Sequence, residues 1–541
     1  MHALHHLRSI SATFYRGGTS KGLIFSPSSL ARFDAPTRDR IICAASSPDP
    51  DMRQISGLGG GASSLSKCAI VSAPADDWSK LARIAGHPFP GVAWSENFER
   101  SMHADQGWDC VYRFGQVPIN GTQIDWGSTC GNLVAAVADY YLSSAIGSSQ
   151  ISASLPPSSQ VKAGDTCSAM LRILAHDTGK VVKARVPVYW EEEIERWMPC
   201  TEGEASIAGV PGTGPAIVIE SPLKSGVLPT GRPVDSIKMN ESEIKVTVTD
   251  TGLPTIFVDA RDLHIPLAQL LDHPSVLESD GELMRRLEKI RYEASQLSTS
   301  LSSKFSPPAP KICLVHPKAA YKTTGGQSIE ASEMDVLIRA LSNGQVHRTV
   351  PATTLSAATA ALCYDDSVIS RAFRASGGQI SPSSSQATST ASPPSTSTFL
   401  HSPDILSLTV GQPAGLSTAS AKTSHVAASR SDQKRSAEPT AIVMTRTARR
   451  IMQGNILVPA AIARPFKGWH NFMPLTPRQH LYETPFEEGA DGSDDLGRDG
   501  QAGPNAEQKR VADMRRWFGS SVSPERGDLE AREEDGVSRI A

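Results

Sequence analysis

The sequence has few features that would indicate a metal, a nucleic acid or a membrane as partner. Its eight cysteines are scattered and include no C-x-x-C pair, which argues against a structural zinc site. The net charge is only −3, and no basic excess suggests a nucleic-acid partner. A run of about 18 apolar residues is also lacking, so the sequence predicts no membrane-spanning segment.

No secretory signal peptide precedes the cysteines, so we expect free thiols in a reducing compartment. Residues 1–33 lack acidic residues and carry several basic ones, a composition loosely similar to a transit peptide. The strand-like pattern that begins at Ile10 leaves at most about nine residues for such a signal. We therefore predict a cytoplasmic protein, with a mitochondrial location as the alternative.

The chain of 541 residues is long enough for two or three domains. Apolar residues make up 39% and charged residues 20%, which is typical of a globular protein with some disordered sequence attached. Residues 376–402 consist mostly of Ser, Thr, Pro and Ala, and we predict a disordered insertion there. Gly, Asp, Glu and Arg dominate residues 471–541, which predicts a mostly disordered tail.

Hydrophobic periodicity predicts a mixture of strands and helices. The helices expected are Thr37–Ala45, Leu133–Leu142, Asp280–Leu301 and Val350–Leu362. The strands expected include Ile10–Phe14, Lys67–Ser72, Cys110–Val117, Thr122–Trp126, Val182–Tyr189, Ile244–Asp250, Thr255–Val258 and Lys311–Val315. Arg446–Gln453 fits either helical turns or a bulged strand. Both halves run through several strands to one Ala-rich helix, so we predict two related α+β domains, residues 1–205 and 206–470.

Three glycine-rich segments carry more polar side chains than ordinary strand connections need. They are residues 16–22, residues 57–67 and residues 125–132. Glycines let the backbone approach a ligand, and the Ser, Thr, Lys and Arg side chains beside them add hydrogen-bond donors, which suits a carboxylate or a phosphate. None of the segments has the spacing of a nucleotide-binding loop. The alternative is that they are simply tight turns.

Cys130 and Lys67 are the residues in these segments with the most reactive side chains. Cys130 directly precedes the helix predicted at Leu133, and a helix N-terminus lowers the pKa of a thiol. Lys67 lies where a glycine-rich loop meets an apolar strand, and partial burial there would lower its pKa toward use as a base. Taken alone, each residue also fits a structural role, as a core cysteine or a lysine at a strand end.

In combination, these segments resemble the PrpF family of methylaconitate and methylitaconate Δ-isomerases. The resemblance rests on Arg16–Gly22, Ser47–Pro50, Gly57–Ser72, Cys130–Asn132, Leu228–Gly231, Pro254–Val258, Leu287–Arg291, Pro310–Ile312 and Arg446–Arg450, in that order. It extends over roughly residues 10–460 and leaves out the insertion and the tail.

The resemblance implies a diaminopimelate-epimerase-like fold. Such a fold has two similar domains, each a curled, mostly antiparallel sheet around a central helix, with the active site in the cleft between them. It also implies an isomerase without a metal or other cofactor, in which Lys67 and Cys130 transfer protons. The residues expected to bind substrate are Arg16, Gly18, Thr19, Ser20, Lys21, Gly60, Ser63, Ser64, Ser66, Gly131, Asn132, His347 and Thr353.

Several positions depart from the family pattern. Thr129 precedes the cysteine where the family usually has Asn, and residues 76–115 look expanded. Thr353-Thr354 stands where a Thr-Gly usually follows His347-Arg348, and residues 411–415 read Gly-Gln-Pro-Ala-Gly instead of Gly-His-Pro-Ser-Gly. The motifs of the second half have changed while Lys67 and Cys130 are kept, so the departures bear on which acid is bound more than on the chemistry.

The expected reaction moves a C=C double bond in a small unsaturated di- or tricarboxylic acid, such as aconitate, methylaconitate or an alkyl itaconate. Proton removal at an allylic carbon gives a dienolate, which is reprotonated two carbons away. The alternatives are a racemase on the same fold, a non-catalytic metabolite-binding partner of an aconitase-like enzyme, and the same reaction on a larger acid. Monomer and homodimer both stay open.

Overall fold

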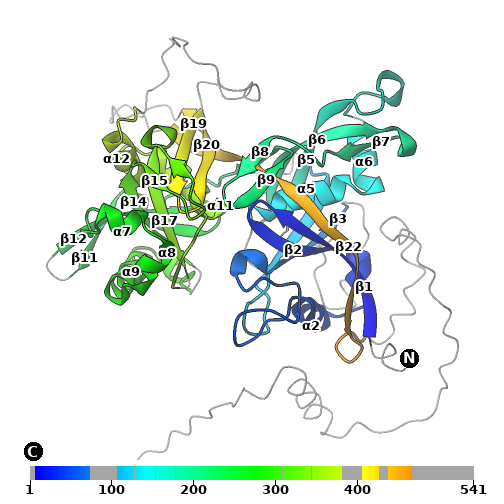
Figure 1. The fold of residues 1–541 in the computed structure, drawn as a ribbon, viewed down its shortest axis with the longest axis horizontal. Helices are drawn as coiled ribbons and strands as arrows, with labels where there is room; N and C mark the ends of the chain where they lie inside the picture. Colours follow the sequence, from blue (N-terminus) through cyan, green and yellow to red (C-terminus); the bar gives the residue numbers. More distant parts are fainter. Residues whose placement is uncertain are drawn as a thin grey trace, which may run out of the picture. The chain divides into compact units, whose positions relative to one another are not determined.

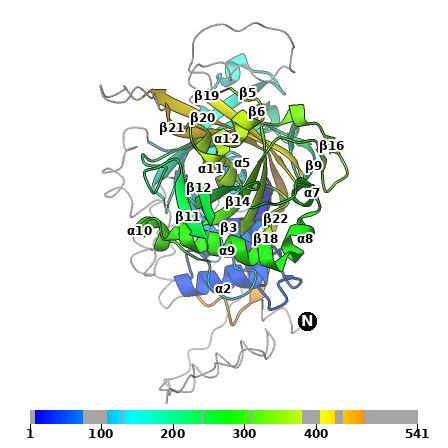
Figure 2. The same cartoon turned by 90° about the vertical axis from the view of Figure 1, so that its left-hand side faces the viewer.

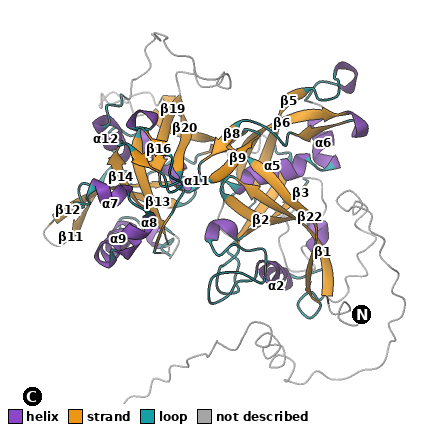
Figure 3. Cartoon of the chain, viewed as in Figure 1, coloured by secondary structure: helices purple, strands orange, loops and turns teal. Residues whose placement is uncertain are grey.

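A computed structural model describes residues 7–73, 107–126, 130–152, 154–176, 178–239, 242–306, 309–342, 344–379, 405–425 and 437–465. Three predicted segments lie wholly or mostly outside these ranges. They are the tail at 471–541, residues 76–106 of the expanded segment, and most of the insertion at 376–402. Strands outnumber helices in both halves of the sequence (Figure 3). The expected α+β class is confirmed.

The strands before residue 230 are β1 (Leu7–Gly17), β2 (Ser20–Phe25), β3 (Lys67–Ser72), β4 (Cys110–Gln116), β5 (Thr166–Ala175), β6 (Lys180–Glu191), β7 (Arg196–Pro199), β8 (Ala205–Ile207), β9 (Val210–Gly214) and β10 (Ile217–Pro222). The later strands are β11 (Asp235–Met239), β12 (Ser242–Asp250), β13 (Pro254–Asp259), β14 (Lys311–Pro317), β15 (Tyr321–Lys322), β16 (Ser328–Ile329), β17 (Val336–Ser342), β18 (Gln345–Val346), β19 (Ile405–Gln412), β20 (Gly415–His425), β21 (Ala437–Arg446) and β22 (Ala448–Pro459).

The helices are α1 (Pro27–Leu30), α2 (Ala35–Ser46), α5 (Leu133–Leu142), α6 (Ala145–Ser152), α7 (Leu267–Leu271), α8 (Pro274–Ser279), α9 (Gly281–Ser295), α10 (Thr299–Ser302), α11 (Ala352–Leu362) and α12 (Val368–Ala375). Within the described ranges, no helix is both long and apolar enough to cross a membrane.

Strand pairing links almost all of the strands into one continuous sheet. From one edge the order is β22, β1, β2, β3, β4, β5 and β6, and it continues through β10, β21, β20, β19, β17, β14, β13 and β12 to β11. β21 has β10 on one side and β20 on the other, so it joins the strands of the first half to those of the second. β22 follows β21 after Thr447 alone and returns along β1.

Two helices are buried along almost their whole length, and each packs against a different set of strands. α5 contacts β1, β2, β3, β6, β7, β10 and β22, whereas α11 contacts β12, β13, β19, β20 and β21 (Figure 1). Both are rich in Ala and Leu, as expected of helices with no solvent-facing side. α5 is further fixed by Asp139, whose carboxylate accepts a hydrogen bond of 2.8 Å from Tyr15 on β1.

Opposite faces of β14 pack against different helices. Cys313 and Val315 point to the core that contains α11, and Ile312 and Leu314 point to a second core that contains α9. Figure 2 shows α9 beside β11 and β14. This alternation places the side chain of Lys311 on the same face of the sheet as Cys313 and α11.

Two predicted elements are wrong. Thr122–Trp126 is not a strand: it makes a single bridge between Asp125 and Gln116. Its alternating pattern arises because Ile124 and Trp126 pack into the core beside α2. The helix predicted for Asp280–Leu301 ends at Ser295, since Ser298 caps a new short helix, α10, by accepting a hydrogen bond from the Ser300 amide.

The sequence of Arg446–Gln453 fitted either helical turns or a bulged strand. In the structure the segment is a strand apart from Thr447. Its pairing with β1 contains a bulge between Phe14 and Tyr15.

Candidate active site

The turn formed by Cys130, Gly131 and Asn132 leads directly into α5. The Cys130 carbonyl accepts hydrogen bonds from the Leu133 and Val134 amides, at 3.1 and 3.3 Å. The Cys130 side chain is 8% exposed and lies at the beginning of the helix, as the sequence predicts. The preceding residues of this segment, 127–129, lie outside the described ranges, and Thr129 with them.

The first glycine-rich segment packs against this turn as the hairpin between β1 and β2. The Ser20 hydroxyl lies 3.6 Å from the Cys130 sulfur, and both groups are buried. A Cβ atom on Gly17 would lie 2.6 Å from the Asn132 carbonyl oxygen, and Gly18 has a positive φ of 51°. The glycines therefore allow the hairpin to approach the turn closely.

Lys67 is the first residue of β3, between Gly22 of β2 and Gln116 of β4. Its amine donates a hydrogen bond of 2.5 Å to the Gln116 side-chain oxygen and lies 5.2 Å from the centre of the Phe114 ring. The Gln116 amide in turn donates to the carbonyls of Ser63 and Ser66, at 3.0 and 2.9 Å. Gln116, which was not predicted as a site residue, thus ties Lys67 to the second glycine-rich segment.

Burial lowers the pKa of Lys67, and the nearby side chains of Cys130, Cys68 and Asp125 act in the opposite direction. Desolvation therefore dominates, and it favours a neutral amine that can accept a proton. The pKa of Lys67 thus responds to the charge of Cys130, the other predicted proton-transfer group.

Two further basic side chains, from the second half of the chain, interact electrostatically with Lys67. Lys311 begins β14 and is 9% exposed, and His347 follows β18 and donates its backbone N–H to the Ala340 carbonyl at 2.8 Å. Burial, with the charge of Lys67 as a second cause, lowers the pKa of Lys311 to about 8. The pKa of His347 falls to about 3, first because of burial and then because of Lys311 and Lys67. His347 was expected at the site, whereas Lys311 was not.

Arg446, at the end of β21, was also missed as a site residue. Its Nε donates a hydrogen bond of 2.8 Å to the Asn132 side-chain oxygen, and the Asn132 amide donates to the Thr19 hydroxyl at 3.1 Å. Burial lowers the pKa of Arg446 to about 10, while the neighbouring Cys130 raises it. This hydrogen-bonded row of Thr19, Asn132 and Arg446 borders the cysteine turn.

The N-terminal ends of the two buried helices meet at this turn. A Cβ atom on Gly131 would lie 3.3 Å from the Cβ of Ala352, the first residue of α11. Helix N-termini carry a partial positive charge and free backbone N–H groups. Together with Lys67, Lys311 and Arg446, they create an environment that suits an anionic ligand.

Other expected binding residues have their polar groups engaged elsewhere. The Arg16 guanidinium donates to Thr447 and to the Gly18 carbonyl, and the Ser66 hydroxyl accepts from Gln54 at 2.8 Å. The Lys21 amine lies 5.9 Å from the centre of the Phe14 ring.

The second glycine-rich segment and Thr353 complete the expected set. Gly60 is exposed, and Ser63 and Ser64 form a short 3-10 helix with Leu65. The Thr353 carbonyl accepts from Thr251 at 3.4 Å, near the beginning of α11.

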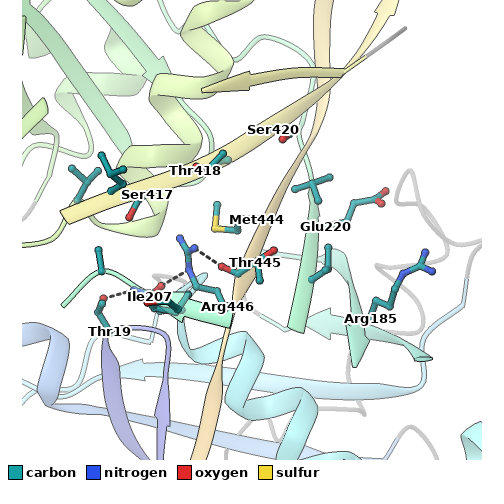
Figure 4. Close-up of a pocket in the computed structure, with 18 of the residues that line it drawn as sticks. Thr19, Arg185, Ile207, Glu220, Ser417, Thr418, Ser420, Met444, Thr445 and Arg446 are labelled. Atoms are coloured by element: carbon teal, nitrogen blue, oxygen red, sulfur yellow. Dashed lines mark hydrogen bonds between the residues drawn. The ribbon is translucent and has the colours of Figure 1, made fainter. Parts of the chain in front are cut away.

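A pocket of about 440 Å³ adjoins the row of Thr19, Asn132 and Arg446 (Figure 4). Strands β6, β10, β20 and β21 and the hairpin of β8 and β9 contribute to its lining. In the part of the chain that is described, no group of three or more His, Cys, Asp or Glu side chains is arranged to hold a metal ion.

Comparison with known proteins places this geometry in context. The family described as "PrpF protein" matches residues 7–81 and 98–392. The chain is 29% identical to the 2-methyl-aconitate isomerase of Shewanella oneidensis, over 68% of this chain and 85% of that protein. It is 27% identical to the 3-methylitaconate isomerase of Eubacterium barkeri, over 68% and 86%. The crystal structure of a methylitaconate-delta-isomerase matches with a TM-score of 0.54 at 24% identity, over 85% of this chain and 98% of that one, which supports a shared fold.

Proposed function

Because the chain belongs to the PrpF family, we propose that it isomerises a small unsaturated di- or tricarboxylic acid by moving its C=C double bond, with Lys67 and Cys130 as the proton-transfer groups. The predicted resemblance is confirmed, and so is the prediction of an isomerase of small unsaturated acids, since the relatives bear names of that kind. The observation that carries the proposed roles is the electrostatic interaction of the buried Lys67 amine with Cys130, together with those of Lys311 with Lys67 and of Arg446 with Cys130.

The reaction begins with removal of a proton from an allylic carbon of the bound acid. The electron pair of the broken C–H bond delocalises through the double bond into a carboxylate, which gives a dienolate. A proton returned to the far carbon of the allylic unit completes the shift of the double bond. In one direction the neutral Lys67 amine takes the proton and the Cys130 thiol supplies one; in the other direction the roles exchange.

The carboxylate that gathers charge needs donors in a desolvated site. We assign this role to Lys311, Arg446 and the N-terminal amides of α5 and α11. Ser20 is the hydroxyl nearest to the Cys130 sulfur and serves to orient the thiol. His347, with a pKa of about 3, stays neutral near pH 7 and therefore contributes a hydrogen bond rather than a charge.

The residues in these roles come from both halves of the chain, so we also propose the division into domains 1–205 and 206–470 with the active site between them. Lys67, Cys130 and Ser20 belong to the first of these ranges, and Lys311 and Arg446 to the second. Ser20, Lys67, Lys311 and Arg446 each begin or end a strand, and Cys130 lies in the turn before α5.

Racemisation, the alternative on this fold, would use two opposed cysteines. Burial raises the pKa of Cys313, and it raises the pKa of Cys363 to about 12. Both thiols lie in the apolar core around α11, which favours the neutral form. These observations leave Cys130 paired with Lys67, as a double-bond shift requires.

The proposal is tested by following cis-aconitate, trans-aconitate and their methylated analogues by NMR in deuterated water. Wild-type protein should move the double bond and incorporate deuterium at the new sp³ carbon. Lys67→Ala and Cys130→Ala should each lower turnover by about 10²–10⁴-fold. Cys43→Ala, which removes another buried thiol on α2, serves as the control and should stay near wild type. Near-normal turnover by both site variants would overturn the assigned roles.

A further inference from the structure

Gln116 is the last residue of β4 and lies directly opposite Lys67 in the antiparallel pairing of β3 and β4. Residues that pair in this way point to the same face of a sheet. Ala69 and Phe114, the next pair on that face, belong to the core that also contains α5 and Cys130. The Lys67 amine and the Gln116 amide therefore lie on the face of the sheet that packs against α5.

The side-chain amide of Gln116 has a fixed orientation. Its Nε2 atom lies 3.0, 2.9 and 3.2 Å from the carbonyl oxygens of Ser63, Ser66 and Val117. An oxygen atom in that position would face three acceptors with no hydrogen to share, so the two ends of the amide cannot exchange places. The Oε1 atom must consequently face Lys67, whose amine donates to it at 2.5 Å.

An amide oxygen can only accept hydrogen bonds, and this property determines how a neutral lysine amine is held. The Lys67 amine turns one N–H bond toward Gln116, so its lone pair points elsewhere. Within the described ranges, the Lys67 side chain makes no other hydrogen bond, which leaves that lone pair available. If the amide were reversed, its N–H groups would bond to the lone pair and occupy it.

Gln116 is also a neutral partner, whereas buried charged groups are usually paired with a group of opposite charge. A carboxylate beside Lys67 would stabilise the ammonium form and raise the pKa of the lysine. An amide oxygen carries only a partial charge. The lowering of the Lys67 pKa by burial therefore persists beside Gln116.

From this geometry we infer that Gln116 is a positioning residue, which holds the Lys67 amine by one N–H and keeps the nitrogen lone pair free to take a proton from the bound acid. The inference rests on the proposed function for the role of Lys67 as a base. It differs from bracing the second glycine-rich segment, a role that Gln54 shares. Gln54 donates to the Ser66 hydroxyl at 2.8 Å and accepts from the Gly61 amide at 3.1 Å.

Gln116→Met tests the inference because it keeps the length of the side chain and removes its acceptor and donors. The kcat of the isomerase should fall about 10–100-fold, since the lone pair is no longer directed, while KM stays within about threefold. The lost hydrogen bond also favours the charged amine, so the midpoint of the Lys67 titration should move down by about one pH unit. NMR of protein labelled with ¹³C at the lysine Cε atoms measures this midpoint without turnover, and Lys67→Ala identifies the signal.

Two further variants make the comparison decisive. Gln116→Asn is shorter by one methylene and should give the same changes to a smaller extent, so the test remains possible if the methionine variant does not fold. Gln54→Met is the matched control, because it removes hydrogen bonds of the same loop and none to Lys67. It should lower the urea midpoint of unfolding and leave both kcat and the Lys67 titration near wild type.

The outcomes separate this inference from the proposed function. Wild-type kcat and an unchanged Lys67 titration in both Gln116 variants would overturn the inference while the isomerase stands. A loss of kcat that Gln54→Met reproduces, with no change in the Lys67 titration, would also overturn it and leave Gln116 as a brace for the loop. A lower Lys67 midpoint in the Gln116 variants, when wild-type protein turns over none of the aconitates, would support the hold of Gln116 on the amine and overturn the proposed reaction.

Discussion

Replacing Lys311 with methionine should stabilise the protein at pH 7. Burial lowers the pKa of this lysine from its ordinary value of 10.5 to about 8, so its charged form is disfavoured in the folded chain. At 1.36 kcal/mol per pH unit, the difference corresponds to about 3 kcal/mol in favour of unfolding. Lys311→Met removes this penalty and keeps an unbranched apolar stem in the core. The interactions that the lysine makes in the folded chain offset part of the gain, so about 3 kcal/mol is an upper limit.

The sign of the pH dependence follows from the same pKa values. Below about pH 8 the lysine is charged in both states and the full penalty is present. Between about 8 and 10.5 the folded state loses its proton before the unfolded state does, and the penalty shrinks. The stability difference between Lys311→Met and wild type should therefore fall toward zero as the pH rises through this window.

Urea unfolding monitored by circular dichroism at pH 7, 8, 9 and 10 measures this difference. Lys245→Met is the control, because that lysine lies at the surface in an ion pair of 3.0 Å with Glu243. Its effect should stay below about 1 kcal/mol and should not change over this range. A methionine variant that is less stable than wild type at pH 7, or a difference independent of pH, would refute the reasoning. Because Lys311 is assigned to bind a carboxylate, the stabilised variant should also lose activity.

Three further predictions concern the residues around the cysteine turn. Gly17→Ala should cost about 1–3 kcal/mol in urea unfolding, since its Cβ would meet the Asn132 carbonyl at 2.6 Å, whereas Gly454→Ala, with no atom within 4 Å, should cost little. Asn132→Ala should lower stability by about 1–3 kcal/mol because it removes the acceptor of the buried Arg446, and the isomerase assay should show a loss of activity too. His347→Gln should reduce the loss of stability between pH 6.5 and 4, because the wild-type histidine takes up a proton only on unfolding in that range. An unchanged unfolding midpoint in Asn132→Ala would contradict the role of Asn132 as acceptor for Arg446. An unchanged dependence of stability on pH in His347→Gln would contradict the burial of a neutral His347.

Much of the secondary structure could be predicted because burial leaves a clear pattern. α5 and β3 have the predicted bounds, since both are almost entirely apolar between polar turns. The break after Ser295 was missed because the helical spacing of apolar residues continues past it to Leu301, although Ser298 is a good cap. The strand structure of Arg446–Gln453 depends on pairing with β1, which no local pattern reports.

Local sequence patterns identified the site residues of the first half of the chain better than those of the second half. Cys130, Lys67 and Ser20 stand in segments whose glycine content is unusual, and that signal led to them. Lys311 and Arg446 begin or end ordinary strands, and they come near the cysteine turn through long-range pairing and the contact between α5 and α11. The sequence signal that could have identified Lys311 and Arg446 is that they lie in two short motifs of the family resemblance, Pro310–Ile312 and Arg446–Arg450. No sequence signal pointed to Gln116, because its role arises from its position opposite Lys67 in the register of β3 and β4.

The pairing of β1 with β22 has a consequence for synthesis of the protein on the ribosome. Leu7 pairs with Pro459, so one edge of β1 has no partner until the chain has grown by about 450 further residues. At roughly 5–20 residues per second, that takes about 20–90 s, which is far longer than hairpin formation. Throughout this time β1 and β2 present an open strand edge of the kind that other nascent chains can join. Production of this enzyme should therefore depend on chaperones that shield the N-terminal hairpin until β22 arrives.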